Sequence, residues 1–162
     1  FNYTNIIMDE KLINKLKEVD CSKVKRFSFE GIKTYAKVAK VYDPDTITIV
    51  FEYFGQMLKL SMRLNGIDAP ELKSKIKEES DACKKGIKLM NDLLLDKIVF
   101  VELDKYDKYG RILGIVNTIE PIKDGLVCVN EYLLKYNYVR VYGGEKKLEW
   151  TQQELDNVGK ST

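Results

Sequence analysis

The sequence of 162 residues contains no histidine. This absence excludes the Ser-His-Asp and Cys-His nucleophile systems, zinc sites built from imidazole, and the commonest general base in enzymes. Any hydrolytic reaction carried out by this chain must therefore rely on carboxylates, arginines and a hard metal ion.

Cysteine is scarce, and Cys21, Cys83 and Cys128 form an odd set without a Cys-x-x-Cys pair. This pattern argues against a disulfide framework and against a thiolate zinc cage. We interpret all three as reduced, mainly structural thiols. Free thiols favour a reducing cellular interior only weakly, so the sequence predicts no compartment.

Long apolar runs are also missing. No stretch of eighteen or more apolar residues is present, so we predict no membrane-spanning segment. The first residues, Phe1-Asn2-Tyr3-Thr4, lack both an initiator Met and the basic-then-apolar order of a signal peptide. We therefore expect a trimmed chain, whose start carries no information on targeting.

The overall composition is that of one globular domain. Hydrophobic residues make up 44% of the chain and charged residues 32%, which suits a domain with a substantial core. The formal net charge is only +2, too small for a general basic field that would attract nucleic acid. Any binding of phosphate must come from locally placed Arg and Lys side chains.

Alternation of apolar and polar residues predicts three consecutive strands in the first half of the chain. The first runs from about Tyr35 to Tyr42, and the turn-forming sequence Asp43-Pro44-Asp45 follows it. The second covers Ile47 to Tyr53, and Gly55 marks a hairpin that leads into the third, from Leu58 to Asn65.

Apolar residues at helical spacing predict four helices. The strongest stripe lies between Lys75 and Asp96, and a shorter amphipathic pattern covers Ile7 to Val19. Asn130 has the chemistry of an N-cap for a helix through Tyr136, and a terminal helix is expected from Glu145 to Val158.

Two more strands are predicted, from Ile98 to Glu102 and from Arg111 to Val116, around a loop from Leu103 to Gly110. The resulting order is a helix, three strands, a helix, two strands and two helices. This order favours the α+β class with a small closed or nearly closed sheet.

Three short segments carry the acids and arginines that could perform chemistry. They are Asp43-Pro44-Asp45-Thr46, the stretch from Arg63 to Glu71 with the sequence RLNGIDAPE, and Asp107-Lys108-Tyr109-Gly110-Arg111. Taken singly, each acid is better explained as a turn former or a helix start, and each arginine as a surface residue or a salt-bridge partner. Arg63 belongs to the polar face of its predicted strand, so its side chain should point away from that strand's core face.

Together, in their order and approximate spacing, these segments resemble the three signatures of the staphylococcal nuclease (thermonuclease-like) family. The resemblance runs from about Tyr35 to near residue 158 and includes the sequence VNEYLL at residues 129–134. It implies an OB-fold, a five-stranded β-barrel with three helices. We therefore expect residues 1–32 to form an N-terminal extension with a short helix, and residues 33–162 to form the nuclease-like domain.

By this resemblance Asp45 and Asp68 would hold Ca²⁺ together with the backbone carbonyl of Ala69. Ca²⁺ takes six to eight oxygen ligands, so this incomplete set leaves positions for a substrate phosphate and for water. Glu71 would act on the attacking water, either as its general base or as a group that orients it.

The same resemblance assigns Arg63 and Arg111 to the scissile phosphate, which two guanidinium groups can grip bidentately as charge builds up. Lys108, Tyr109 and Tyr142 would be secondary substrate-binding residues, although ordinary solvated or packed side chains explain them equally well. The implied activity is calcium-dependent endonucleolytic cleavage of single- and double-stranded DNA and RNA, which leaves 3′-phosphate ends.

The sequence departs from the family pattern at a few positions. Pro44 stands where a glycine is common and should stiffen the turn, while Ala69 replaces a common threonine but still offers a carbonyl oxygen. The hairpin from Tyr53 to Met57 looks long, which could alter access to a cleft.

Two other functions stay open. One is a non-catalytic OB-type module that binds single-stranded nucleic acid through stacking aromatics. The other is a protein-interaction domain that reuses the barrel, with a protein partner bound through the N-terminal extension.

Overall fold

The structure of this chain is a computed structural model that describes residues 9–161. Within this range it has seven strands and four α-helices. The strands are β1 (Lys33–Asp43), β2 (Thr46–Tyr53), β3 (Gln56–Leu64), β4 (Ile67–Asp68), β5 (Ile98–Tyr106), β6 (Ile112–Thr118) and β7 (Arg140–Val141). The helices are α1 (Glu10–Lys17), α2 (Lys77–Leu94), α3 (Val129–Lys135) and α4 (Gln152–Asn157), and a 3₁₀ turn, η1, covers Cys21–Lys23.

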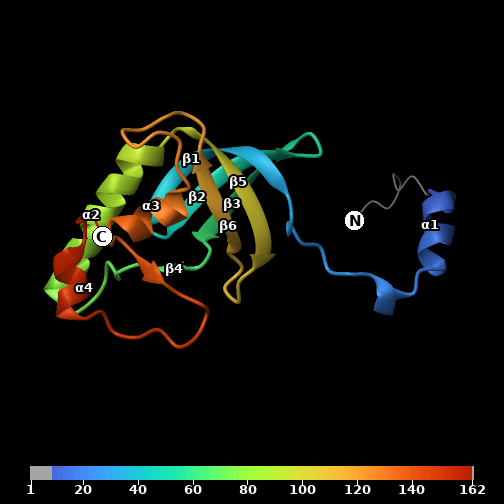
Figure 1. Cartoon of the computed structure of the whole chain (residues 1–162). Coiled ribbons are helices and arrows are strands. Elements are labelled where there is room, and N and C mark those ends of the chain that lie inside the picture. The colour runs from blue at the N-terminus through green and yellow to red at the C-terminus, as the bar shows by residue number, and fades with distance from the viewer. Residues whose placement is uncertain (1–8, 162) are drawn as a thin grey trace, which may run out of the picture.

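Five of the strands close into a barrel in the order β1-β2-β3-β6-β5 (Figure 1). All neighbours in this barrel are antiparallel except β3 and β6, which run parallel. Outside the barrel, β4 and β7 pair as a small antiparallel sheet. The predicted α+β class and the five-stranded OB-type barrel are therefore confirmed.

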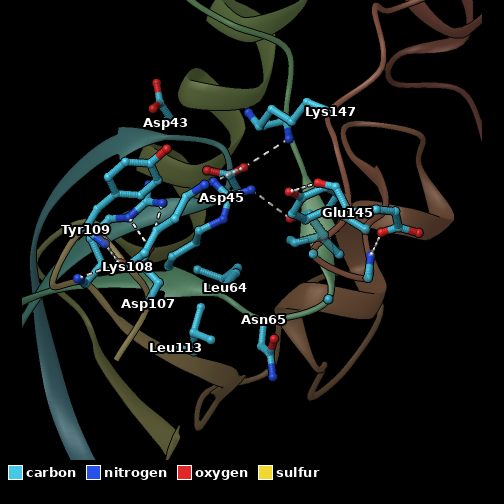
Figure 2. Close-up of a pocket in the computed structure, with 18 of the residues that line it drawn as sticks. Asp43, Asp45, Leu64, Asn65, Asp107, Lys108, Tyr109, Leu113, Glu145 and Lys147 are labelled. Carbon is cyan, nitrogen blue, oxygen red and sulfur yellow. Dashed lines mark hydrogen bonds and ion pairs between the residues drawn. The ribbon is translucent and has the colours of Figure 1, made fainter. Parts of the chain in front are cut away.

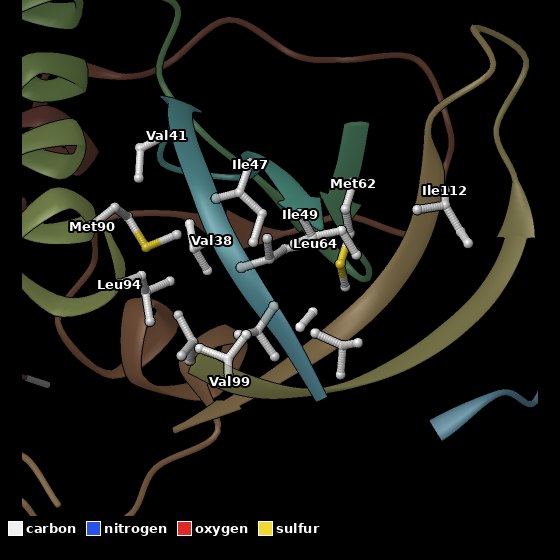
Figure 3. Packing of buried hydrophobic residues seen from close by; sticks show 14 of the residues in the cluster. Val38, Val41, Ile47, Ile49, Met62, Leu64, Met90, Leu94, Val99 and Ile112 are labelled. Atoms are coloured by element: carbon white, nitrogen blue, oxygen red, sulfur yellow. The ribbon is translucent and has the colours of Figure 1, made fainter. Parts of the chain in front are cut away.

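Side chains that alternate along the strands fill the barrel. Ile47 and Ile49 of β2 meet Met62 and Leu64 of β3 inside it, as Figure 3 shows. Helix α2 packs against β1 and adds Met90 and Leu94 to the same core. Because each of these residues is fully buried, the two-residue period of the strands and the helical period of α2 together determine which side chains point inward.

The structure corrects several predicted boundaries. Strand β5 continues to Tyr106, so the expected loop from Leu103 to Gly110 is much shorter. Helix α4 begins at Gln152 rather than at Glu145, because Thr151 and Glu154 form a reciprocal capping box there. The prediction of Asn130 as an N-cap is wrong: Cys128 holds that position and makes no side-chain cap hydrogen bond.

The N-terminal part differs from the barrel in its packing. Helix α1 falls within the predicted Ile7 to Val19, of which Ile7 lies outside the described residues, and none of its side chains is buried. Figure 1 shows α1 apart from the barrel. Phe29, which is only 3% exposed, joins the barrel core and contacts the ring of Phe51 edge-on at 5.5 Å. The division into an extension at 1–32 and a domain at 33–162 stays a prediction.

Asn130 turns its side chain inward and ties three elements together. Its amide nitrogen donates to the backbone carbonyls of Asn65 at 3.0 Å and Gly114 at 3.4 Å, and its amide oxygen accepts from the N–H of Val116 at 3.2 Å. Helix α3 is thereby attached to β6 and to the segment directly after β3. That segment begins two residues beyond Arg63, so Asn130 helps to fix the frame of the candidate site.

We predict that Asn130→Ala lowers the free energy of unfolding by about 2 kcal/mol, because buried backbone groups lose their partners. Urea unfolding followed by circular dichroism measures this change. Glu131→Ala, an exposed substitution in the same helix, should stay within about 0.5 kcal/mol of the parent. Equal stabilities of the two variants would contradict a structural role for the Asn130 amide.

Candidate active site

A cleft of about 1150 Å³ lies where the β1–β2 turn, the segment after β3, the β5–β6 loop and the segment after β7 meet. Figure 2 shows side chains from these four segments converging on it. Eight of the nine predicted site residues line this cleft: Asp45, Arg63, Ala69, Glu71, Lys108, Tyr109, Arg111 and Tyr142. Asp68 is the exception, since it is buried beneath the lining.

Asp45 is held rigidly in the turn between β1 and β2. It is 2% exposed, and one carboxylate oxygen accepts from the hydroxyl of Thr46 at 2.8 Å. The other oxygen accepts from the backbone N–H of Ala69 at 3.0 Å and lies 2.8 Å from Nη1 of Arg63. The turn, β3 and the segment after β4 therefore meet at this one carboxylate.

Arg63 points away from the core face of β3, as predicted, but its guanidinium is buried rather than solvated. It is 8% exposed and lies between two acids, with Nη1 bound to Asp45 and Nη2 at 3.4 Å from Asp68. Nη2 also donates to the carbonyl of Ile67 at 3.1 Å. The ring of Tyr142 lies 5.9 Å from the guanidinium carbon. One guanidinium thus brings Asp45 and Asp68 to the same place.

Asp68 is surrounded by cations. It lies on β4, is 1% exposed, and is paired in register with Arg140 of β7. Its Oδ2 atom accepts from Arg140 at 3.2 Å, while its Oδ1 atom lies 2.7 Å from the ammonium of Lys147. With Arg63 this makes three positive groups around one carboxylate, and two of them, Arg63 and Lys147, line the cleft.

Glu71 lies at the rim of the cleft. Its side chain is exposed, but its backbone is fixed by a hydrogen bond. Its Oε1 atom lies 2.6 Å from the ammonium of Lys147. Its backbone N–H donates to the buried carboxylate of Glu79 at 2.9 Å, and Glu79 also accepts from the hydroxyl of Ser74 at 2.6 Å. Helix α2 therefore holds the start of the segment that carries Glu71.

Arg111 is positioned by its own loop. Both Nε and Nη2 of its guanidinium contact Oδ2 of Asp107 at 2.7 Å, and Oδ1 of Asp107 accepts from the N–H groups of Tyr109 and Arg111. Burial alone would raise the pKa of Asp107, but these hydrogen bonds outweigh it and lower that pKa. The ring of Tyr109 lies 5.1 Å from the Lys108 ammonium and 5.4 Å from the Arg111 guanidinium.

Negative charge accumulates at the β1–β2 turn despite these cations. Burial, together with the charges of Asp45 and Glu71, raises the pKa of Asp43 to about 6. A carboxyl with such a pKa marks a place where additional positive charge would be stabilised. Asp43 also lines the cleft.

The donor set suits Ca²⁺ in its chemistry. Asp45 and Asp68 are bridged by one guanidinium, Asp43 and Glu71 lie nearby, and all of these donors are hard oxygens. Among residues 9–161, however, no three Asp, Glu or Cys side chains gather as a ready cluster for a metal ion. The oxygen donors therefore suit the ion in type, but Asp45 is paired with Arg63, and Asp68 with Arg63, Arg140 and Lys147, so these ion pairs must rearrange before the two acids can share a metal ion.

Sequence reasoning missed Arg140 and Lys147, which both contact Asp68. The only signal for Arg140 was a charge between Val139 and Val141, in a segment too short to show a strand period. Lys147 follows Lys146 in a charged run, which is typical of a solvated surface segment. Neither residue could be linked to Asp68 without the pairing of β4 with β7.

Comparison with known proteins assigns the family. The model of the Staphylococcal nuclease homologue family matches residues 61–161, more than half of the chain, so this chain belongs to that family. The matched range contains Arg63, Asp68, Glu71 and Arg111, whereas Asp45 precedes it.

Two curated relatives resemble the chain at a similar level. An uncharacterized protein of Methanocaldococcus jannaschii is 31% identical over 128 residues, which cover 67% of this chain and 59% of the relative. A protein of Escherichia coli named an uncharacterized endonuclease is 32% identical over 108 residues, covering 67% of this chain and 61% of the relative. The chain thus spans about three fifths of the length of these relatives. No helix in the range 9–161 is long and apolar enough to cross a membrane.

We predict that Glu71→Gln lowers the pKa of Asp43 below about 6, because removal of a neighbouring negative charge favours the ionised carboxylate. Carboxyl NMR titration in a chelator-containing buffer measures this pKa directly. Glu131→Gln, on the exposed side of α3, should leave it unchanged. An Asp43 pKa that is the same in both variants would show that Glu71 does not act on it.

Proposed function

We propose that this protein is a calcium-dependent endonuclease that hydrolyses phosphodiester bonds of DNA and RNA. One observation carries the proposal: Arg63 and Arg111 line the same cleft as Asp45 and Glu71, in a domain of the staphylococcal nuclease family. The E. coli relative that is named an endonuclease supports the same reaction class.

The two arginines would bind the phosphate that is cleaved. The guanidinium of Arg111 is oriented by Asp107, and that of Arg63 by Asp45 and the carbonyl of Ile67. Because both groups are positioned before substrate arrives, they can stabilise the charge that grows on the phosphate oxygens without much reorganisation. Their planar donors match phosphate geometry better than an ammonium group would.

Asp45, Asp68 and the carbonyl of Ala69 would hold the Ca²⁺ ion. When bound, this ion would polarise the phosphate as a Lewis acid. Asp45 is prepared for this role, since its position is fixed by Thr46 and by the N–H of Ala69.

Glu71 would position the attacking water and accept its proton. The new bond would form between the water oxygen and phosphorus while the bond from phosphorus to the 5′ oxygen breaks, and the leaving 5′ oxygen would take up a proton from solvent. The products are then a 3′-phosphate and a free 5′-hydroxyl. Glu71 suits this task because its carboxylate at the cleft rim stays accessible to water while its backbone is held in place.

Lys108, Tyr109 and Tyr142 would contact the neighbouring nucleotides. All three line the cleft, and the exposed ring of Tyr109 offers a face on which a base can stack. Such contacts carry no base specificity, which fits cleavage of both DNA and RNA.

We expect the protein to cut labelled single-stranded DNA and RNA in Ca²⁺ buffer and to stop when EGTA is added. Arg111→Ala should lower kcat by about 10²–10³, the range seen when one preorganised donor to a transition state is removed. Arg26→Ala removes the same charge outside the cleft and should retain parent activity. No cleavage by the parent at any Ca²⁺ concentration would refute the nuclease proposal.

A second measurement separates cleavage from binding. Glu71→Gln should still bind a fluorescent oligonucleotide within about threefold of the parent, since its phosphate-binding arginines are intact, and should lose about 10²–10⁴ in rate. End-group analysis of the parent's products should show 3′-phosphates. If the parent and Glu71→Gln both bind the strand and neither cuts it, the domain is a non-catalytic binding module.

A further inference from the structure

We propose that the ammonium of Lys147 takes the place of the metal ion when no ion is bound. Because Ca²⁺ must displace this ammonium, Lys147 sets the Ca²⁺ concentration at which the ion binds. The inference rests on the proposed function, because it concerns the same ion. It assigns a specificity-determining role to a residue outside the barrel and outside the predicted catalytic set.

The ammonium of Lys147 contacts Asp68, a proposed ligand of the ion, and Glu71, the proposed base beside it. It lies 2.7 Å from Oδ1 of Asp68 and 2.6 Å from Oε1 of Glu71, and Figure 2 shows its side chain reaching into the site. Lys147 lines the cleft, whereas Asp68 does not. Arg63 is the other cation that both lines the cleft and contacts Asp68, so an ion that enters from the cleft meets these two cations at Asp68.

Of the three cations around Asp68, Lys147 is the one that can leave most easily. Arg140 also donates to the carbonyls of Leu148 and Glu149, lies 3.6 Å from Glu154 and stacks on the ring of Trp150 at 4.5 Å. Arg63 retains Asp45 and the carbonyl of Ile67 as partners. The polar contacts of the Lys147 ammonium are Asp68 and Glu71, so displacement costs it these two contacts.

The backbone around Lys147 is suited to local movement. Among the described residues, those from 143 to 150 make no backbone-to-backbone hydrogen bond. The segment begins with Gly143 and Gly144. It is held at Glu145, whose carbonyl accepts from the Tyr142 hydroxyl and whose carboxylate accepts from the Gly143 N–H, and by Arg140 on the carbonyls of Leu148 and Glu149. Lys147 lies between these anchors, so its long side chain can withdraw from Asp68 and Glu71 while Glu145 and Leu148 stay in place.

Charge determines which ions can replace Lys147. Four carboxylates, Asp43, Asp45, Asp68 and Glu71, lie close enough together that their charges act on one another or on the same cations. A monovalent ion would replace one positive charge by another and gain nothing to offset the lost contacts of Lys147. A divalent ion adds one further positive charge, so the exchange favours it.

Direct measurement of Ca²⁺ binding tests the proposal without an activity assay. Isothermal titration calorimetry with CaCl₂ should give Lys147→Met a Kd about tenfold lower than the parent, which corresponds to about 1.4 kcal/mol. Lys146→Met is the matched control, because it removes the same charge from the same segment and has no contact with Asp68 or Glu71. Its Kd should stay within about twofold of the parent.

Thermal unfolding adds a second readout. In EGTA, Lys147→Met should melt below Lys146→Met, because Asp68 and Glu71 lose a partner, and added Ca²⁺ should raise its Tm more than that of the parent. Equal Ca²⁺ affinity of Lys147→Met and Lys146→Met would overturn the role of Lys147 and leave the nuclease proposal intact. Absence of Ca²⁺ binding in the parent and in Lys147→Met would overturn both.

Discussion

The arrangement of the site depends on the guanidinium of Arg63, which lies between Asp45 and Asp68. Burying three charged groups in this way carries a desolvation cost that their mutual attraction offsets only when every group is well partnered. Here Thr46, Ala69 and Ile67 supply the remaining hydrogen bonds to Asp45 and Arg63. The network therefore contributes less to stability than to position, since it holds two carboxylates from separate strand ends at a common point.

The barrel makes this meeting possible through register. Thr46 at the start of β2 pairs with Arg63 near the end of β3, so Asp45 in the preceding turn comes to lie beside the arginine. The orientation of these strands could be predicted from sequence, because the alternation of Ile47 and Ile49 with polar neighbours determines which face of the sheet is buried. The resemblance to staphylococcal nucleases then added the expectation that these residues converge, and eight of the nine predicted residues line one cleft.

The remaining features could not be predicted, because they depend on contacts between segments far apart in the chain. Strand β7 is two residues long and carries no periodic signal, yet it places Arg140 opposite Asp68, seventy-two residues away. The inward turn of Asn130 likewise depends on Asn65 and Gly114, which a local capping rule does not consider. The contact of Lys147 with Asp68 is of the same kind. A lysine in a charged run is normally expected to be solvated, and only the three-dimensional structure shows that Asp68 lies next to it.

Rigidity is distributed unevenly around the cleft, and this distribution bears on how the site could work. Asp107 and Arg111 are held within one tight loop, and Asp45 by three partners, so these groups are preorganised. The segment from 143 to 150 is held by side-chain hydrogen bonds at Glu145, Leu148 and Glu149, and makes no backbone-to-backbone hydrogen bond within the described residues 9–161. The proposed phosphate-binding group of Arg111 is therefore held firmly, while Lys147, which contacts Asp68 and Glu71, lies on a segment with fewer restraints. Such a site can keep its arginines fixed while Ca²⁺ replaces the ammonium of Lys147 between the acids.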